Sequence, residues 1–223
     1  MNTLLSENIL NAKKELKQKI ESIPNPYHEK KIDAMIKWVG ILEAFETIEN
    51  KYDVIVNIGC GLDSLPLYLK PFCEQCYALD MGLINPEYSK NNILVRHTNF
   101  FDWNELPAES VDIFIDSCAV THFDIKSENG FKNIGIKNTF EKISHLLKKG
   151  GYFIITSDCV SENTDSIEFV QPQYWIDIAK SMNLILTSEF VHPPLNSNHE
   201  NTPFSFVYNR YNLKILRLMF QKI

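Results

Sequence analysis

A short β-branched stretch that breaks into two closely spaced glycines constrains this fold more than any other feature. Residues 54–58 read Val-Ile-Val-Asn-Ile, and Gly59 and Gly61 follow at once, ahead of a helical pattern at residues 64–69. Glycine carries no Cβ, so a Gly-x-Gly bend after a buried strand lets the backbone come close to a nucleotide. The pattern predicts an α/β sheet whose first strand leads into a nucleotide-binding bend.

An acidic residue ends the next predicted strand. Residues 76–80 read Cys-Tyr-Ala-Leu-Asp, which places Asp80 close to the spacing of roughly 20 residues that is typical of ribose-binding carboxylates. A carboxylate there can accept hydrogen bonds from both ribose hydroxyls, and such charge-assisted bonds are strong. A solvated aspartate at a strand end is the alternative interpretation, and the glycines upstream favour the ribose role.

Charge near the bend narrows the choice of nucleotide. The third glycine of the dinucleotide motif is absent, and Asp63 is predicted to be the N-cap of the helix that follows. A carboxylate at this point would repel a pyrophosphate, which commonly binds at a helix N-terminus. NAD and FAD are therefore less favoured than a nucleoside that carries no phosphate.

Over residues 50–190 the chain resembles the class I S-adenosylmethionine-dependent methyltransferases. The first motif of that family is an acid, a hydrophobic residue and Gly-x-Gly-x-Gly; here Asn57 replaces the acid and Asp63 replaces the last glycine. The resemblance implies a Rossmann-like, doubly wound α/β fold: a seven-stranded, mostly parallel sheet with helices on both faces and an antiparallel last strand. It also implies S-adenosyl-L-methionine as the cofactor and methyl transfer by in-line displacement at the sulfonium carbon.

The resemblance assigns residues to the cofactor. After the third strand, a polar side chain is expected to meet the adenine: spacing favours Asn99 with Phe100, chemistry favours Asp102 with Trp103, and the choice stays open. The fourth strand and the turn beyond it are expected to lie between the cofactor and the acceptor. The predicted cofactor-binding residues are Asn57, Gly59, Cys60, Gly61, Asp80, Met81, Asn99, Phe100, Asp102, Asp116 and Ser117.

The predicted catalytic residue is a histidine after the fourth strand. An oxygen acceptor needs a general base, and an imidazole titrates near neutral pH, so His122 is the first candidate. A hydrogen-bonded shell histidine is the alternative role, and His192 and His199 are weaker candidates. The polar loop 192–203, together with residues 127–131, is expected to carry acceptor specificity.

The chain is expected to form one globular domain in two parts. With 223 residues and 44% hydrophobic content it can bury a full core without disulfides or metal. Residues 1–50 are predicted to form N-terminal helices that cap residues 51–223, the S-adenosylmethionine-binding domain. In the family such helices often close over the cofactor, so Tyr27, His28 and Trp38 are candidates either for a lid or for simple cover of the sheet.

Composition bears on the partners. A net charge of -6 argues against a protein that holds nucleic acid through its phosphates. No run of about 18 apolar residues occurs, and the N-terminus does not follow the pattern of a signal peptide, so we expect no membrane association and a cytoplasmic location. The partner that the resemblance implies is a small-molecule acceptor.

Cysteine usage points away from a metal centre. The five cysteines do not form a secreted disulfide framework, being odd in number. Cys73 and Cys76 form a Cys-x-x-Cys pair, but a zinc site needs two further ligands at matched spacing, and Cys76 is expected along a buried strand. Cys60 is expected to act as a small packing residue, and no metal is predicted.

Helix and strand patterns complete the sheet. A helix over residues 133–149 is predicted to end in Lys148 and Lys149, which suit a helix C-terminus, with Gly150 or Gly151 as the left-handed cap. The other predicted elements are helices at 5–20, 32–45 and 172–182, strands at 93–97, 111–116, 152–155 and 184–191, and a last strand at either 213–220 or 204–208.

Three functions fit the sequence. The first is a small-molecule methyltransferase, with O-methylation of a sugar or secondary metabolite as the favoured reaction. The second is a nicotinamide-dependent oxidoreductase on a similar sheet, which Asp63 and the missing third glycine disfavour. The third is a non-catalytic relative that binds the nucleoside, which the departures at Asn57 and Asp63 favour.

Overall fold

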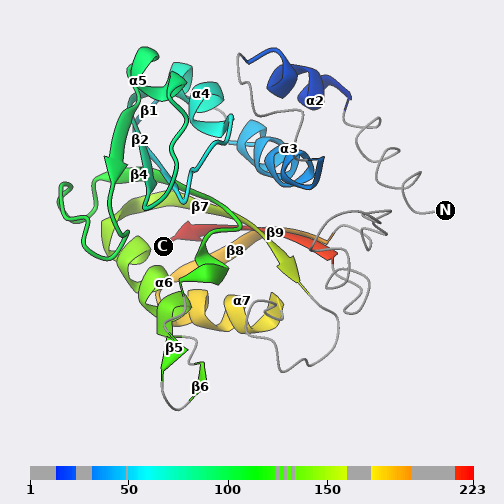
Figure 1. Cartoon of the computed structure of the whole chain (residues 1–223). Helices are drawn as coiled ribbons and strands as arrows, with labels where there is room; N and C mark the ends of the chain where they lie inside the picture. The colour runs from blue at the N-terminus through cyan, green and yellow to red at the C-terminus, as the bar shows by residue number, and fades with distance from the viewer. Residues whose placement is uncertain are drawn as a thin grey trace.

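A single twisted sheet runs through the molecule (Figure 1). It has seven strands in the order β3-β2-β1-β4-β7-β9-β8, and β9 is antiparallel to both of its neighbours. This confirms the predicted doubly wound sheet with an antiparallel last strand. In this computed structural model, the described residues are 14–23, 32–48, 50–123, 126–127, 130–131, 134–159, 172–191 and 214–223. The strands are β1 Tyr52–Ile58, β2 Cys73–Asp80, β3 Leu94–His97, β4 Val111–Ser117, β7 Leu147–Cys159, β8 Leu184–Val191 and β9 Lys214–Lys222.

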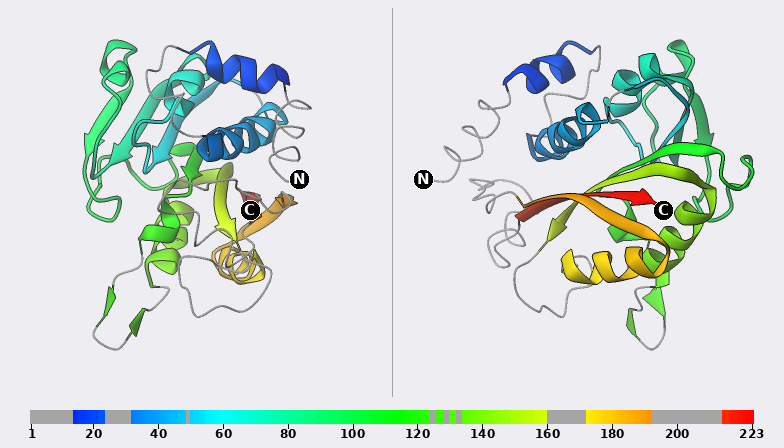
Figure 2. Two further views of the ribbon diagram at one scale, coloured as in Figure 1. Left: turned by 45° about the vertical axis from the view of Figure 1, so that its right-hand side comes forward. Right: turned by 180° about the vertical axis from the view of Figure 1, so that it is seen from behind.

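Two layers of helices cover the sheet, one on each face (Figures 1 and 2). One layer holds α2 (Lys14–Glu21), α3 (Ile32–Glu46), α4 (Leu65–Leu69) and α5 (Glu87–Lys90); the other holds α6 (Ile134–Leu146) and α7 (Pro172–Ser181). Shorter elements are η2 (Lys70–Phe72), η3 (Val120–His122) and a small hairpin of β5 (Lys126–Ser127) and β6 (Gly130–Phe131). Among the described helices, none is long and apolar enough to cross a bilayer.

The strand order explains where a ligand can bind. The chain builds outward from β1 through β2 to β3, then returns to β4 on the other side of β1. In a parallel sheet, such a reversal leaves a crevice outside the carboxyl ends of the two central strands. The bend at residues 59–61 follows β1 and the turn at residues 118–120 follows β4, so both stand at this crevice.

Strand β1 is buried on both faces, which its β-branched sequence favours. Ile55 packs in the core cluster under α3, whereas Val54, Val56 and Ile58 pack in the cluster under α6 and α7. Trp38 of α3, a lid candidate, is buried in the first cluster, and the other two lid candidates lie outside the described residues. The last strand occupies residues 214–222, and the competing segment 204–208 also lies outside them.

The predicted C-terminus of the helix at 133–149 is wrong. Helix α6 ends at Leu146, and the next residue already begins β7. Lys148 instead pairs with Asp53 of β1 and Asp112 of β4, with Nζ to carboxylate distances of 2.6 and 2.8 Å. Gly150 is left-handed with φ 82°, but it lies in an irregularity of β7 and not at a helix end. Sheet pairing and these ion pairs override the local helix signal.

The N-cap assigned to Asp63 is also wrong. Helix α4 starts at Leu65 with Ser64 as the N-cap, and the Ser64 side chain makes no capping hydrogen bond to this helix. The Asp63 amide donates to the Cys60 carbonyl at 2.9 Å, which closes a turn before the helix begins. Asp63 is buried, one residue before the N-cap.

Candidate cofactor-binding and active site

The glycine bend is fixed between two neighbouring segments. Gly59 and Gly61 are both left-handed, with φ values of 60° and 44°. A Cβ on Gly59 would lie 2.0 Å from the Cβ of Ala119, in the turn after β4. The amide of Cys60 donates to the carbonyl of Leu79 at 3.1 Å, so the bend is also tied to β2. The bend therefore has room only for glycine at its closest approach.

Asp80 stands at the carboxyl end of β2 and orders the loops around it. One carboxylate oxygen accepts the amide of Gly61 at 2.9 Å, and the other accepts the amide of Gly82 at 2.6 Å. A carboxylate offers about four lone-pair sites, so each oxygen retains capacity for a further donor. Met81, directly beyond, is 74% exposed. Asp80 is thus positioned and still able to bind a pair of hydroxyl groups.

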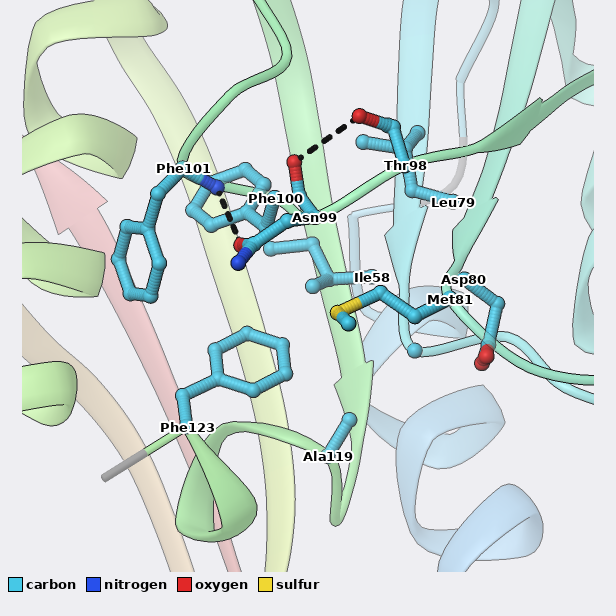
Figure 3. Close-up of a pocket in the computed structure, with 11 residues that line it drawn as sticks. Ile58, Leu79, Asp80, Met81, Thr98, Asn99, Phe100, Phe101, Ala119 and Phe123 are labelled. Atoms are coloured by element: carbon cyan, nitrogen blue, oxygen red, sulfur yellow. Dashed lines mark hydrogen bonds between the residues drawn. The ribbon is translucent and has the colours of Figure 1, made fainter. Parts of the chain in front are cut away.

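A cavity of about 410 Å³ opens at the crevice (Figure 3). Its walls are mostly apolar with a few polar groups, as is common for sites that bind nucleosides and other small molecules. It is lined by Ile58, Gly59, Leu79, Asp80, Met81, Thr98, Asn99, Phe100, Phe101, Ala119 and Phe123.

Aromatic rings surround one end of the cavity. Phe101 and Phe123 meet edge to face with ring centroids 5.9 Å apart. Asn99 lies between them and Thr98, and its side-chain oxygen accepts the amide of Phe101 at 3.0 Å (Figure 3). Asp102 is exposed and does not line the cavity. A flat base could stack here, with the Asn99 amide beside it.

Lys142 supports the segment that forms this aromatic end. Its Nζ donates to the carbonyls of Phe101 and Trp103 at 3.0 and 2.5 Å, and lies 5.1 Å from the centre of the Phe100 ring. Burial lowers the pKa of Lys142. The lysine comes from α6, on the far side of the cavity wall, so no local pattern in the sequence could assign it to this segment.

The turn after β4 forms the opposite wall. Asp116 is fully buried, and its two oxygens accept the amides of Ala119 at 2.7 Å and Val120 at 3.1 Å. Burial raises the pKa of Asp116 to about 7. Cys118, which lies between Asp116 and Ala119 in the sequence, has a left-handed φ of 70°. Ser117 is half-buried and does not line the cavity.

A buried ion pair lies farther along the carboxyl edge of the sheet. Lys37 of α3 and Asp158 of β7 are 2.8 Å apart, with side chains 9% and 13% exposed. The Cys118 thiol donates to the same Asp158 oxygen at 3.5 Å. The second Asp158 oxygen is buried and makes no hydrogen bond within the described part of the chain. An isolated buried charge is costly, so such a pair at the edge of a ligand crevice is a functional candidate.

No family model matches the sequence, and no curated protein matches it. Solved structures do. A 1,6-didemethyltoxoflavin-N1-methyltransferase from Burkholderia thailandensis is 11% identical with a TM-score of 0.62, covering 97% of this chain and 89% of that one. The geranyl diphosphate C-methyltransferase from Streptomyces coelicolor is 11% identical with a TM-score of 0.58, covering 91% and 88%. The N-methyltransferase NodS from Bradyrhizobium japonicum is 11% identical with a TM-score of 0.57, covering 89% and 98%.

The chain has the class I methyltransferase fold. Identities this low show the fold alone. Within this fold, the predicted cofactor residues divide into two groups. Gly59, Asp80, Met81, Asn99 and Phe100 line the cavity. The others, which are not among the lining residues, are Asn57, Cys60, Gly61, Asp102, Asp116 and Ser117.

The predicted base can be placed only by its backbone. His122 ends η3 and directly precedes Phe123, which lines the cavity; its side chain is outside what the structure describes. His192 and His199 lie outside the described residues altogether. Among the described residues, no group of histidine, cysteine, aspartate or glutamate is arranged to hold a metal ion.

Sequence reasoning missed several residues of the cavity wall. Phe101 and Phe123 were not assigned, although each stands shortly after the end of a strand that reaches the crevice. Bulky side chains in such positions are a usable signal. The Lys37 and Asp158 pair had no such signal, because 121 residues separate its members.

Proposed function

We propose that this protein is an S-adenosyl-L-methionine-dependent methyltransferase with a small-molecule acceptor. The supporting observation is the cavity at the crevice, which combines a glycine bend, a strand-end carboxylate and an aromatic pocket. In this proposal Asp80 binds the ribose hydroxyls. Asn99 and Phe100 hold the adenine, in preference to the exposed Asp102. The bend carries the methionine end.

The residues present fit this cofactor. Asn57, one residue before the end of β1, is completely buried, and neither its side-chain oxygen nor its side-chain nitrogen forms a hydrogen bond to any described residue. Leaving a buried polar group unsatisfied costs about 1–3 kcal/mol. An amino-acid group bound beyond the bend, or a water molecule held between the two, would satisfy that amide. The amide is neutral, so it can serve as donor to a carboxylate or as acceptor to an ammonium.

The aromatic residues of the cavity and His122 suggest how the acceptor would react. When bound, the cofactor supplies a methyl group already activated on a sulfonium. Phe100 and Phe123 exclude water from the cavity, which favours transfer to the acceptor. We propose a hydroxyl of a sugar or secondary metabolite as the acceptor, with His122 taking the hydroxyl proton on its imidazole.

The structural neighbours agree with a small acceptor. One was solved with 1,6-didemethyltoxoflavin and another with geranyl diphosphate. These acceptors differ widely in chemistry, so the neighbours support the size class of the acceptor and leave its identity to experiment. The net charge of -6 likewise favours a small molecule over nucleic acid.

Calorimetric titration with S-adenosylhomocysteine tests the proposal. The wild type should bind, and Asp80→Ala should weaken binding severalfold or more, because two charge-assisted hydrogen bonds are lost. Asp102→Ala is the matched control, since that carboxylate is exposed and outside the cavity wall. No heat of binding at millimolar ligand would overturn the assignment. Binding of NADH in a fluorescence titration would instead support an oxidoreductase.

Transfer of a labelled methyl group tests the catalytic part. With a panel of hydroxylated acceptors, His122→Ala should lower turnover by about 10²–10⁴ while cofactor affinity stays close to that of the wild type. Equal turnover for the two proteins would remove His122 from the mechanism. Cofactor binding without transfer to any acceptor would favour the non-catalytic relative.

A further inference from the structure

One buried carboxylate holds the turn that forms a wall of the cavity. Asp116 is 0% exposed and accepts two backbone amides, one on each oxygen, from Ala119 and Val120. Ala119 lines the cavity (Figure 3). Its Cβ occupies the space that a Cβ on Gly59 would need. The position of Asp116 therefore sets how closely the turn approaches the glycine bend.

The turn needs such a restraint because its backbone is strained. Cys118 has a φ of 70°, and a non-glycine residue in this region costs on the order of 1–3 kcal/mol unless its surroundings enforce it. The two hydrogen bonds to Asp116 span this residue directly. If one of them is lost, Cys118 can relax, and Ala119 can move relative to the cavity.

We propose that Asp116 is a positioning residue for the nucleoside cavity, and that only its carboxylate form holds the turn in the binding geometry. The reason is donor and acceptor matching. A carboxylate accepts on both oxygens, whereas a protonated carboxyl turns one oxygen into a donor that faces an amide N–H. Protonation therefore gives up one of the two hydrogen bonds. This inference rests on the proposed function, because the bound cofactor is its readout.

Protonation falls within an accessible pH range. Burial raises the pKa of Asp116 to about 7, and the amides of Ala119 and Val120 oppose that rise. The charged groups nearby in the described structure are Lys37 of α3, which also lowers this pKa, and its partner Asp158 of β7. Among the described residues, the Cys118 thiol is a further titratable neighbour, and burial raises its own pKa. From β1 and β7, the paired residues Ile58 and Ile155 are apolar.

The effect of Asp116 protonation on the free energy of unfolding is opposite to what general acid unfolding would produce. The pKa of Asp116 in the folded protein, about 7, is above the ordinary aspartate pKa of 3.8 that applies to the unfolded chain, so the folded state holds this proton more tightly. Its contribution to the free energy of unfolding is therefore fully present below the lower pKa and is lost as pH rises through the higher one. Acid should thus favour the fold through Asp116 and weaken cofactor binding through the same residue.

The test is the pH dependence of S-adenosylhomocysteine affinity in the wild type and in Asp116→Asn. If only the carboxylate form binds, wild-type affinity should fall by about tenfold between about pH 8 and about pH 6, following the ionised fraction. Asparagine presents an N–H to one amide and cannot ionise, so the variant should bind more weakly at about pH 8 than the wild type does at about pH 6. Its affinity should stay constant over this range.

Controls keep the outcomes distinct. His97→Gln replaces an exposed histidine that is the register partner of Asp80 on β3, and it should keep the wild-type pH profile. Urea unfolding of both proteins should show that Asp116→Asn removes the contribution to stability that falls as pH rises. This contribution changes with pH in the direction opposite to the affinity. If the variant does not fold, the test uses the wild type alone, with its S-adenosylhomocysteine affinity and its free energy of unfolding both measured as a function of pH.

Each result decides between the two proposals. A wild-type affinity that does not change with pH, or an Asp116→Asn variant that binds as tightly as the wild type at about pH 8, overturns the role of Asp116 and leaves the methyltransferase assignment standing. Absence of S-adenosylhomocysteine binding at every pH overturns the proposed function, and this inference with it.

Discussion

The two faces of the sheet are built from different chemistry. Under α6 and α7, Phe140 packs edge-on against Phe153 with ring centroids 5.3 Å apart, within a wider aromatic cluster. Under α3, charged side chains enter the layer: Lys37 pairs with Asp158, and Arg217, on β9, has a side chain only 8% exposed. One face is a packed hydrocarbon layer, and the other holds charge close to the carboxyl edge.

This difference indicates a division of roles. Aromatic packing stabilises the fold and leaves no charge to be satisfied. A buried ion pair must overcome the cost of removing both partners from water, so it contributes less to stability than apolar side chains of similar size. We therefore expect substitutions under α6 and α7 to change the free energy of unfolding, and substitutions near the crevice to change ligand binding.

The largest effect should come from the aromatic face. Phe140→Ala should lower the free energy of unfolding by about 3–5 kcal/mol, because it removes a fully buried ring and leaves a cavity. Urea denaturation measures this, and S-adenosylhomocysteine affinity of the folded protein should stay close to wild type. Tyr174→Ala on α7 is the control: this ring is partly exposed, and the change should stay within about 0.5 kcal/mol. Similar losses for both variants would contradict the division.

The ion pair should show a characteristic double-mutant pattern. Lys37→Met leaves Asp158 buried without its cation and should destabilise the fold by about 3 kcal/mol. Adding Asp158→Leu removes the remaining charge, and most of the lost stability should return, while methyl transfer should stay impaired. Urea unfolding together with the transfer assay measures both. A double variant with full transfer activity would place the pair in the structural layer and outside the site.

Glycine substitutions in the bend and in α3 should have different effects on ligand binding. Gly59→Ala should weaken S-adenosylhomocysteine binding by about tenfold or more, because the left-handed backbone is strained and the new Cβ collides with Ala119. Gly40→Ala is the matched control, since its Cβ would make an ordinary contact 3.6 Å from Thr156. That variant should gain about 0.5–1 kcal/mol in stability through helix propensity. Wild-type affinity in Gly59→Ala would remove the bend from the site.

The smallest effect should be at Lys142. Lys142→Met removes the cation that holds the carbonyls of Phe101 and Trp103, so the aromatic end of the cavity should loosen and affinity should fall by about threefold. Lys137→Met, on the exposed side of the same helix, should leave affinity unchanged. An identical result for the two lysines would show that α6 does not order the cavity wall.

Much of the fold could be predicted because its signals are local. The β-branched run before Gly59, the acid at the end of β2 and the strand at 184–191 each depend on a few neighbouring residues, and each element appears where its pattern predicts it. The errors arose where a distant residue decided. Lys148 suits a helix C-terminus locally, yet carboxylates on β1 and β4 draw it into β7.

The sequence by itself determined the order of strands and helices, the glycine bend and the carboxylate after the second strand, because hydrophobic periodicity and glycine chemistry act over short stretches. Only the tertiary structure decided which polar side chains face the cavity and which support it from behind. Asp116 supports the turn with both oxygens, and Asn99, not Asp102, lines the cavity. The physical reason is that burial and hydrogen-bond pairing depend on segments brought together across the sheet, which no local pattern encodes.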